Sequence, residues 1–248
     1  MNVAASPVIS AAVMALNEQP NIRETIANLL QAAGNAQVPI EIIIVNDGST
    51  DDTGKISDEL SRLHSNIRVL HHPVNMGLGV NVKDALAVAS APKFIIVPGD
   101  NDMSVALLEQ LFSYHDKADI IMSYFLNREV RGRVRNIISA VFNLIYMSTF
   151  NVFVQYINGP CVYPTERLKK LRLHANRFSI VVEMTIKMLC SGCTYHEVYG
   201  YMATGLRGSS SLSWRNFREV MSMYLRLCWE VKVSHRDEFG KSPRRLFL

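Results

Sequence analysis

The sequence has little charge, few cysteines and no recognisable nucleic-acid-binding motif. Charged residues make up only 19% of the 248 residues, and the net charge is +4. No internal repeat, linker or low-complexity stretch divides the chain, and 48% of the residues are hydrophobic. These features exclude nucleic acid as an expected partner and indicate one large domain that buries a substantial core.

The four cysteines are too few and too scattered for a disulfide framework, which fits a reducing compartment. Cys190 and Cys193 have the spacing of a zinc or redox pair, but no second Cys or His pair lies near them. We therefore expect a helix end followed by a turn there. The apolar start of the chain is broken by Ser6-Pro7, and its first charged residue is the acidic Glu18, so we expect no signal peptide and a cytoplasmic protein.

Two carboxylates follow an apolar run that reads as a buried strand. Residues Phe94 to Pro98 form the run, and Gly99 then leads into Asp100, Asn101 and Asp102. Ligand-binding groups of α/β sheets lie at strand ends, and hard cations such as Mg²⁺ or Mn²⁺ prefer oxygen ligands shared with phosphates. The motif therefore predicts a cation and a diphosphate ligand. A simple turn capping a helix that begins near Ser104 explains the same residues and stays open.

A second acidic motif ends the β-prone run from Glu41 to Val45. Asp47 stands at its tip before Gly48, where a carboxylate can accept hydrogen bonds from a nucleotide base or ribose, or can serve a turn. Asp51 and Asp52 suit the first turn of the following helix.

Other segments alternate in the same way between strands and helices. A strand from Val8 to Leu16 precedes a helix, and a strand from Ile67 to Leu70 precedes the glycine turn of Asn75, Gly77 and Gly79. Glycines allow close backbone approach to a phosphate or ribose. This alternation predicts a mostly parallel α/β sheet with helices on both faces.

Four motifs together resemble the family 2 glycosyltransferases in order and spacing: Met14–Glu18, Val45–Asp51, Asn75–Gly79 and Gly99–Asp102. The resemblance implies a GT-A (Rossmann-like) fold, a nucleotide-diphospho-sugar donor, Mg²⁺ or Mn²⁺, and inversion at the anomeric carbon. It extends to about residue 212 in the manner of the dolichyl- and polyprenyl-phosphate sugar transferases, through Asn158–Pro164, Phe178–Glu183 and Arg207–Ser211.

The resemblance also implies roles for particular residues. Asp100 and Asp102 are expected to hold the cation, with Arg207 closing over the donor phosphates and Glu183 as a candidate base. Donor contacts are expected from a set that also includes Asp100: Glu18, Asp47, Asn75, Gly77 and Gly79. Three departures from the family pattern, Leu16, Asn46 and Ser104, leave the nucleotide base and the metal preference open.

A cluster of arginines precedes a long segment without charge. Four arginines lie within eight residues, and no further charged residue appears until Glu166: Arg128, Arg131, Arg133 and Arg135. We expect them to grip an acceptor phosphate. The helix predicted over 136–150 is apolar around most of its surface, so it is either core or membrane-facing. Its recurring Ser, Thr and Asn argue against a membrane span.

A second amphipathic helix is predicted from Trp214 to Val231, followed by a basic tail that favours anionic lipid surfaces. We thus expect a glycosyltransferase domain over 1–212, with a nucleotide-sugar half (1–103) and an acceptor half (104–212), and a C-terminal segment over 213–248.

The sequence therefore predicts a metal-dependent hexosyltransferase, peripheral at the inner face of a membrane, that glycosylates a polyprenyl phosphate or another lipid-linked acceptor. A sugar-hydroxyl acceptor in cell-surface polysaccharide or lipopolysaccharide synthesis, with Glu183 as base, is one alternative. A non-catalytic nucleotide-sugar-binding module and a nucleotidyltransferase are two others, although the glycine- and basic-rich loop of the latter is missing. A homo-oligomer remains open.

Overall fold

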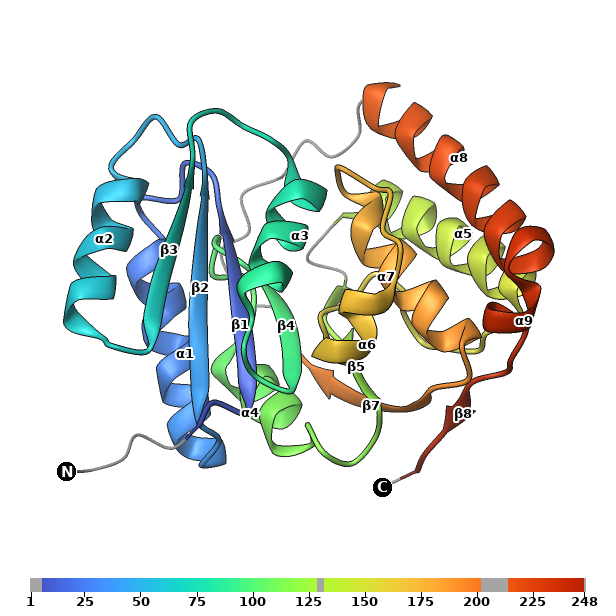
Figure 1. The fold of residues 1–248 in the computed structure, drawn as a ribbon, viewed down its shortest axis with the longest axis horizontal. Helices are drawn as coiled ribbons and strands as arrows, with labels where there is room; N and C mark the ends of the chain where they lie inside the picture. Colours follow the sequence, from blue (N-terminus) through green and yellow to red (C-terminus); the bar gives the residue numbers. More distant parts are fainter. Residues whose placement is uncertain (1–5, 129–131, 202–213, 248) are drawn as a thin grey trace.

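The computed structural model describes residues 6–128, 132–201 and 214–247, with side chains in the last range described from residue 218. An eight-stranded sheet runs through the molecule and carries helices on both faces (Figure 1). Its strand order is β3-β2-β1-β4-β6-β5-β7-β8, and only β6 runs antiparallel to its neighbours. The predicted α/β class with a mostly parallel sheet is confirmed.

The strands predicted near residues 8–16, 41–45, 67–70 and 94–98 are all present. The eight strands are β1 (Ile9–Ala15), β2 (Ile40–Asp47), β3 (Ile67–His72), β4 (Lys93–Pro98), β5 (Ile120–Phe125), β6 (Cys161–Pro164), β7 (Thr194–Gly200) and β8 (Arg244–Arg245). The described helices are α1 (Ile22–Ala36), α2 (Thr53–Leu63), α3 (Leu78–Val88), α4 (Val105–Ser113), α5 (Arg133–Phe150), α6 (Thr165–Lys170), α7 (Ser179–Cys190), α8 (Trp214–Trp229), the π-helix η2 (Glu230–Ser234) and α9 (Arg236–Phe239).

Strands β1, β2 and β4 form the centre of the nucleotide-sugar half. Val13 of β1 pairs with Ile44 of β2 on one side and with Val97 of β4 on the other. All three side chains are almost completely buried, as expected for a parallel strand covered on both faces. Because the three strands are parallel, Asp47 at the end of β2 and the loops that carry Glu18 and Asp100 lie at the same edge of the sheet.

Two hydrophobic cores fill the two faces of the sheet. One contains buried residues of α1, α2 and α4, and the other contains buried residues of α3, α5, α6, α7 and α8. Met223, Leu227 and Val231 place the C-terminal helices in the second core. The segment 213–248, expected to follow the glycosyltransferase domain, therefore shares that domain's hydrophobic core in its described part.

Helix α5 corresponds to the predicted apolar helix over 136–150, but it is not a buried core helix. Of its residues, only Tyr146 and Phe150 are buried. Its opposite side is exposed, with Ile137 at 64% and Leu144 at 62%. Among the described residues, no helix has both the length and the apolar content needed to cross a membrane.

Part of the predicted basic tail forms a strand at the sheet edge. Arg244 and Arg245 form β8, which pairs with β7 at the sheet edge, and Arg245 Nη2 lies 2.9 Å from Glu197 Oε2. Cys190 ends α7 and Gly192 adopts a positive φ of 83°, so the predicted helix end and turn are confirmed. All four cysteines are free.

Candidate active site

A cleft of about 370 Å³ opens where the carboxyl ends of the parallel strands β1 and β4 lie. It brings together four of the predicted site residues, contributed by three separate loops or helix ends: Glu18, Asp100, Asp102 and Arg135. Asn158, Tyr156 and Phe178, to which the sequence assigned no individual role, also line it. The cleft thus combines carboxylates, an arginine, an amide and aromatic rings in one space.

Asp100 and Asp102 are held by a tightly packed turn after β4. Gly99 N donates to Met14 O (2.9 Å), and a Cβ at Gly99 would lie 2.8 Å from that same oxygen. Asn101 adopts a positive φ of 59°, and its Oδ1 accepts a hydrogen bond from Asn28 Nδ2 (2.8 Å). The glycine and the left-handed asparagine therefore place both aspartates at the mouth of the cleft.

The motif forms the turn before α4 that the alternative interpretation predicts. Asp102 N donates to Asp100 Oδ1 (3.3 Å), and Ser104 Oγ caps α4 by accepting from Leu107 N (3.3 Å). A cap and a ligand site are compatible here, because Ser104 does the capping. Asp100 is exposed and Asp102 half-buried, and both line the cleft. Two carboxylates with space beside them fit the oxygen ligand set of Mg²⁺ or Mn²⁺.

Asp47 anchors the glycine turn that precedes α3. Its side chain is buried; Oδ1 accepts from Met76 N (2.7 Å), and Oδ2 accepts from Gly77 N (3.1 Å). His72 lies between Asp47 and Asp84, with Nε2 3.0 Å from Asp84 Oδ2. Asp47 thus stabilises the turn before α3 through these two hydrogen bonds, while its contact with a nucleoside stays a prediction.

Gly77 and Gly79 approach protein backbone. A Cβ at Gly77 would lie 2.8 Å from Asn176 O, and one at Gly79 would lie 2.4 Å from Ala175 O. Gly79 N also donates to Asn176 O (3.0 Å). The close packing of α3 on the segment 175–176 therefore explains both glycines without a ligand. Asn75 is exposed, and neither it nor the two glycines line the cleft.

Among the described arginines of the predicted cluster, Arg135 alone lines the cleft. Arg135, in the first turn of α5, lines the cleft, whereas Arg133 is exposed and does not. The guanidinium of Arg128 lies 4.9 Å from the ring centroid of Tyr156 and donates to Ser139 Oγ (3.0 Å), so Arg128 braces the start of α5. Arg131 and Arg207 lie outside the described residues.

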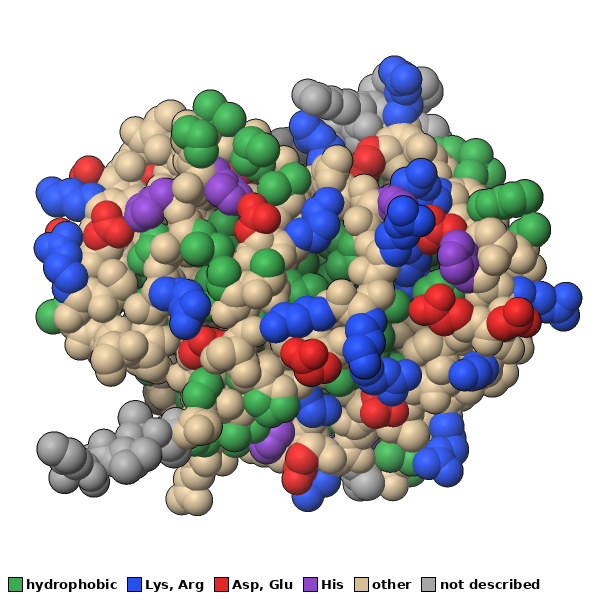
Figure 2. Space-filling view, viewed as in Figure 1, with side chains coloured by type: hydrophobic (Ala, Val, Ile, Leu, Met, Phe, Trp, Pro, Cys, Tyr) green, Lys and Arg blue, Asp and Glu red, His purple; other side chains and the backbone are tan. Residues whose placement is uncertain are grey.

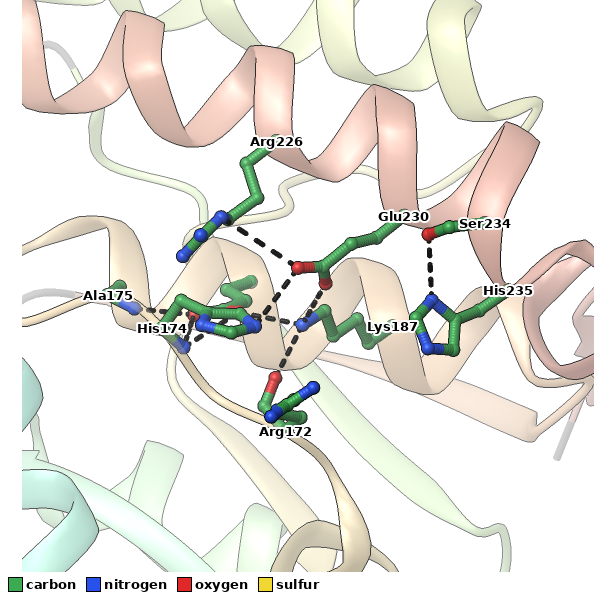
Figure 3. Close-up of polar contacts among 9 residues, drawn as sticks. Arg172, His174, Ala175, Lys187, Arg226, Glu230, Ser234 and His235 are labelled. Atoms are coloured by element: carbon green, nitrogen blue, oxygen red, sulfur yellow. Dashed lines mark hydrogen bonds and ion pairs between the residues drawn. The ribbon is translucent and has the colours of Figure 1, made fainter.

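Glu183 belongs to a buried ionic network instead of the cleft. Its carboxylate is fully buried and accepts hydrogen bonds from His174 N (3.0 Å) and Ala175 N (2.8 Å). Lys187 Nζ lies 2.8 Å from Glu183 and 2.6 Å from Glu230, which also contacts His174 (Figure 3). A base must reach substrate, and this carboxylate does not line the cleft. The geometry gives Glu183 a structural role and does not fit the expected base.

The same network contains a geometric group of potential metal ligands. Oxygen and nitrogen atoms of His174, Glu183 and Glu230 lie within 4.8 Å of one another. The ammonium of Lys187, however, already contacts both carboxylates. The positive charge of Lys187 therefore replaces a cation at this position. The sequence could have indicated the Glu183–Lys187 ion pair, because these two residues are the only charged ones in α7 and lie four positions apart.

Comparison with protein families identifies the family of this chain. The sequence profile described as glycosyl transferase family 2 matches residues 10–177. The chain belongs to glycosyl transferase family 2. The matched range includes the Glu18, Asp47 and Asp100–Asp102 motifs and most of the cleft.

The sequence matches to curated relatives cover less than half of this chain. An uncharacterized glycosyltransferase of Haemophilus influenzae is 29% identical over 115 residues, which cover 46% of this chain and 35% of the relative. A dolichyl-phosphate beta-glucosyltransferase of Trichomonas vaginalis is 35% identical over 93 residues, covering 37% of this chain and 28% of the relative. The chain thus matches about a third of the length of these relatives.

Solved structures share the fold over most of the chain. Glucosyl-3-phosphoglycerate synthase from Mycobacterium tuberculosis in complex with UDP has a TM-score of 0.67 and 21% identity, covering 90% of this chain and 81% of that chain. The same enzyme was also crystallised with Mg²⁺ and UDP, and with Mn²⁺, UDP and glucosyl-3-phosphoglycerate. This likeness confirms the expected GT-A fold.

Proposed function

We propose that this chain transfers a sugar from a nucleotide-diphospho-sugar to the phosphate of a lipid-linked acceptor. The observation that carries the proposal is the meeting of Asp100, Asp102 and Arg135 in one cleft at the carboxyl edge of the sheet. This cleft combines a carboxylate pair suited to a cation and diphosphate with a guanidinium suited to a second anion. Family membership and the likeness to UDP-bound structures support the donor.

Asp100 and Asp102 would hold Mg²⁺ or Mn²⁺, which when bound stabilises the negative charge of the departing nucleoside diphosphate. Asp47 keeps the turn before α3 in place, and Glu18 offers a further acceptor for the nucleoside. Phe178 and Tyr156 line the same cleft and offer aromatic surfaces to a bound donor or acceptor.

Arg135 would orient the acceptor phosphate through charge-assisted hydrogen bonds. A phosphate acceptor with a second pKa of about 6 is already ionised near neutral pH, so its oxygen attacks without a base. The structural role of Glu183 supports a phosphate acceptor over a sugar hydroxyl, because it removes the base on which the hydroxyl alternative relied. The dolichyl-phosphate relative also supports a lipid acceptor. With such an acceptor, the proposed position of the chain is peripheral, at the inner face of a membrane.

The donor site is tested by Asp102→Asn, with Asp116→Asn as a matched control. Asp116 is an exposed aspartate that does not line the cleft and pairs only with the neighbouring Lys117 among the described contacts. In calorimetric titrations with UDP and other nucleoside diphosphates, we expect Asp102→Asn to lose Mn²⁺-dependent binding and transfer while its melting temperature changes little. The control should bind like the parent. Undiminished Mn²⁺-dependent binding by Asp102→Asn would contradict the assignment.

A further inference from the structure

Helix α5 presents an unpartnered apolar surface to solvent. Its inward residues Tyr146 and Phe150 are buried in the core. The outward residues recur three or four positions apart, and all are large, apolar and exposed: Val134, Ile137, Ile138, Val141, Leu144 and Ile145. Monomeric proteins rarely expose a continuous patch of this kind, which marks an interaction surface.

Helix α8 extends this surface. Met221, Leu225 and Trp229 form an exposed apolar stripe along it, and Val233 continues the stripe on η2. Figure 2 shows hydrophobic side chains along the edge of the molecule formed by α8. The two helices touch through Tyr224, whose Oη lies 2.7 Å from Thr149 Oγ1 and whose ring lies 5.2 Å from that of Tyr146. These contacts make α5 and α8 neighbours, and each carries an exposed apolar stripe.

On these two helices and η2, the acidic side chains are buried or half-buried and the exposed charged side chains are basic. The acidic side chains turn inward: Glu230 is 13% exposed and bound to Lys187, and both carboxylate oxygens of Glu219 are buried. The exposed charges among the described residues of the same elements are all basic: Arg133, Arg218, Arg226 and Lys232. This surface is thus apolar with a positive rim.

A basic cavity lies at the far end of the same surface. It has a volume of about 430 Å³, and Thr149 and Phe150 at the end of α5 form one wall. Lys232, Arg236 and Lys241 also line it, and its described lining contains no Asp or Glu. The nearest exposed acids in the sequence, Asp237 and Glu238, lie on α9 outside that lining. The cavity suits an anionic headgroup phosphate.

We infer that the exposed faces of α5 and α8 form one docking surface for an anionic lipid bilayer. Amphipathic helices with apolar and aromatic residues on one side and basic residues at the rim bind such bilayers in the plane of the interface. A second copy of the chain fits less well, because two positive rims would face each other. Arg135 lies on the first turn of α5, so a docked bilayer would adjoin the cleft.

Vesicle binding tests this inference, with matched exposed positions as control. The variant Leu144→Ser/Leu225→Ser changes two exposed leucines, one on each helix. The control Leu63→Ser/Val74→Ser changes residues that are 72% and 60% exposed outside α5 and α8. In co-sedimentation with vesicles of phosphatidylcholine and phosphatidylglycerol, we expect a loss of roughly tenfold or more in partitioning for the first variant and no loss for the control. Both should melt like the parent.

A second variant tests the charge. Lys232→Gln/Lys241→Gln should weaken binding to vesicles that contain phosphatidylglycerol, and added salt should weaken parental binding in the same way. The inference deepens the proposed function, but binding is measured without transfer, so either can fail alone. Equal partitioning of the parent and the Leu144→Ser/Leu225→Ser variant would overturn it. A parental dimer that this variant dissociates, without vesicle binding, would assign the face to a second copy instead.

Discussion

At the scale of single residues, the structure separates two uses of carboxylates that look alike in the sequence. Asp100 lines an open cleft, whereas Glu183 is enclosed by backbone amides and Lys187. A buried charge without its partner is costly, so the two members of the Glu183–Lys187 pair depend on each other. An exposed metal ligand carries no such constraint, since water solvates it when the metal leaves.

Replacing one member of the buried pair should destabilise the fold. We expect Lys187→Met to lower the free energy of unfolding by about 3–5 kcal/mol, because it leaves the carboxylates of Glu183 and Glu230 without the cation that they share. Glu183→Gln should cost less, because Lys187 keeps Glu230 as its partner. The double variant should lose less than the sum, with a coupling of about 0.5–3 kcal/mol. Urea denaturation of the single and double variants measures both quantities.

The surface pair of Arg23 and Glu59 provides the control, and Glu59→Gln should cost about 1 kcal/mol or less. A Glu183→Gln protein that unfolds like the parent but has lost transfer would instead restore Glu183 as a base.

At the scale of elements, the two arginines in the first turn of α5 lie in different surroundings, one in the cleft and one in solvent. Residues two apart on a helix point in directions about 200° apart, since each residue turns the helix by about 100°. Arg135 accordingly reaches the cleft while Arg133 faces solvent. A run of arginines that resembles a single clamp in the sequence thus supplies one described side chain to the site.

This arrangement gives α5 its own test. Arg135→Ala should leave nucleotide affinity within about twofold of the parent but reduce transfer to a polyprenyl phosphate by roughly tenfold or more, as expected for the loss of a charged hydrogen bond worth about 1.5–3 kcal/mol. Arg133→Ala should affect transfer much less. Parallel calorimetry and transfer assays compare the two, and equal losses would show that the position on α5 does not matter.

At the scale of the whole molecule, the C-terminal helices complete the core that supports the cleft. Leu227 and Val231 are buried in the same cluster as Ile180 and Met184 of α7. Through Glu230, η2 also contacts His174 (Figure 3). Two residues further on, the backbone oxygen of Asn176 accepts a hydrogen bond from Gly79 N. The last part of the chain is therefore linked to the start of α3.

Deleting residues 213–248 should consequently prevent cooperative folding of the remaining 1–212 segment. Each large apolar side chain lost from a core costs about 2–5 kcal/mol, and the deletion removes Met223, Leu227, Val231 and Phe239 together. The summed cost for these four side chains is comparable to the whole free energy of unfolding of a typical domain, which is about 5–15 kcal/mol. Removing only Phe247 and Leu248 is the control, because Phe247 is 83% exposed. Circular-dichroism melting curves distinguish the two, and a cooperative transition in the longer deletion would establish 1–212 as an independent domain.

The sequence by itself determined the parallel sheet and the position of the carboxylate motifs. Alternating apolar runs and helical periods specify strands and helices locally, and parallel strands bring their carboxyl ends to one edge. Asp100 and Asp102 could therefore be placed at a strand end, and the resemblance to family 2 added Glu18 to the same site. The cap at Ser104 and the helix end at Cys190 were predictable for the same reason, since both depend on neighbours within a few residues.

Only the tertiary structure decided what each remaining residue faces. Gly77 and Gly79 are required by the backbone of Asn176 and Ala175, about a hundred residues away in the sequence. The ion network of Glu183 needs Glu230 from a distant helix, and the outward side of α5 is apolar although its sequence pattern fitted a core helix equally well. Such contacts depend on how helices pack across the sheet, and short-range periodicity carries no information about the partner that a helix face will meet.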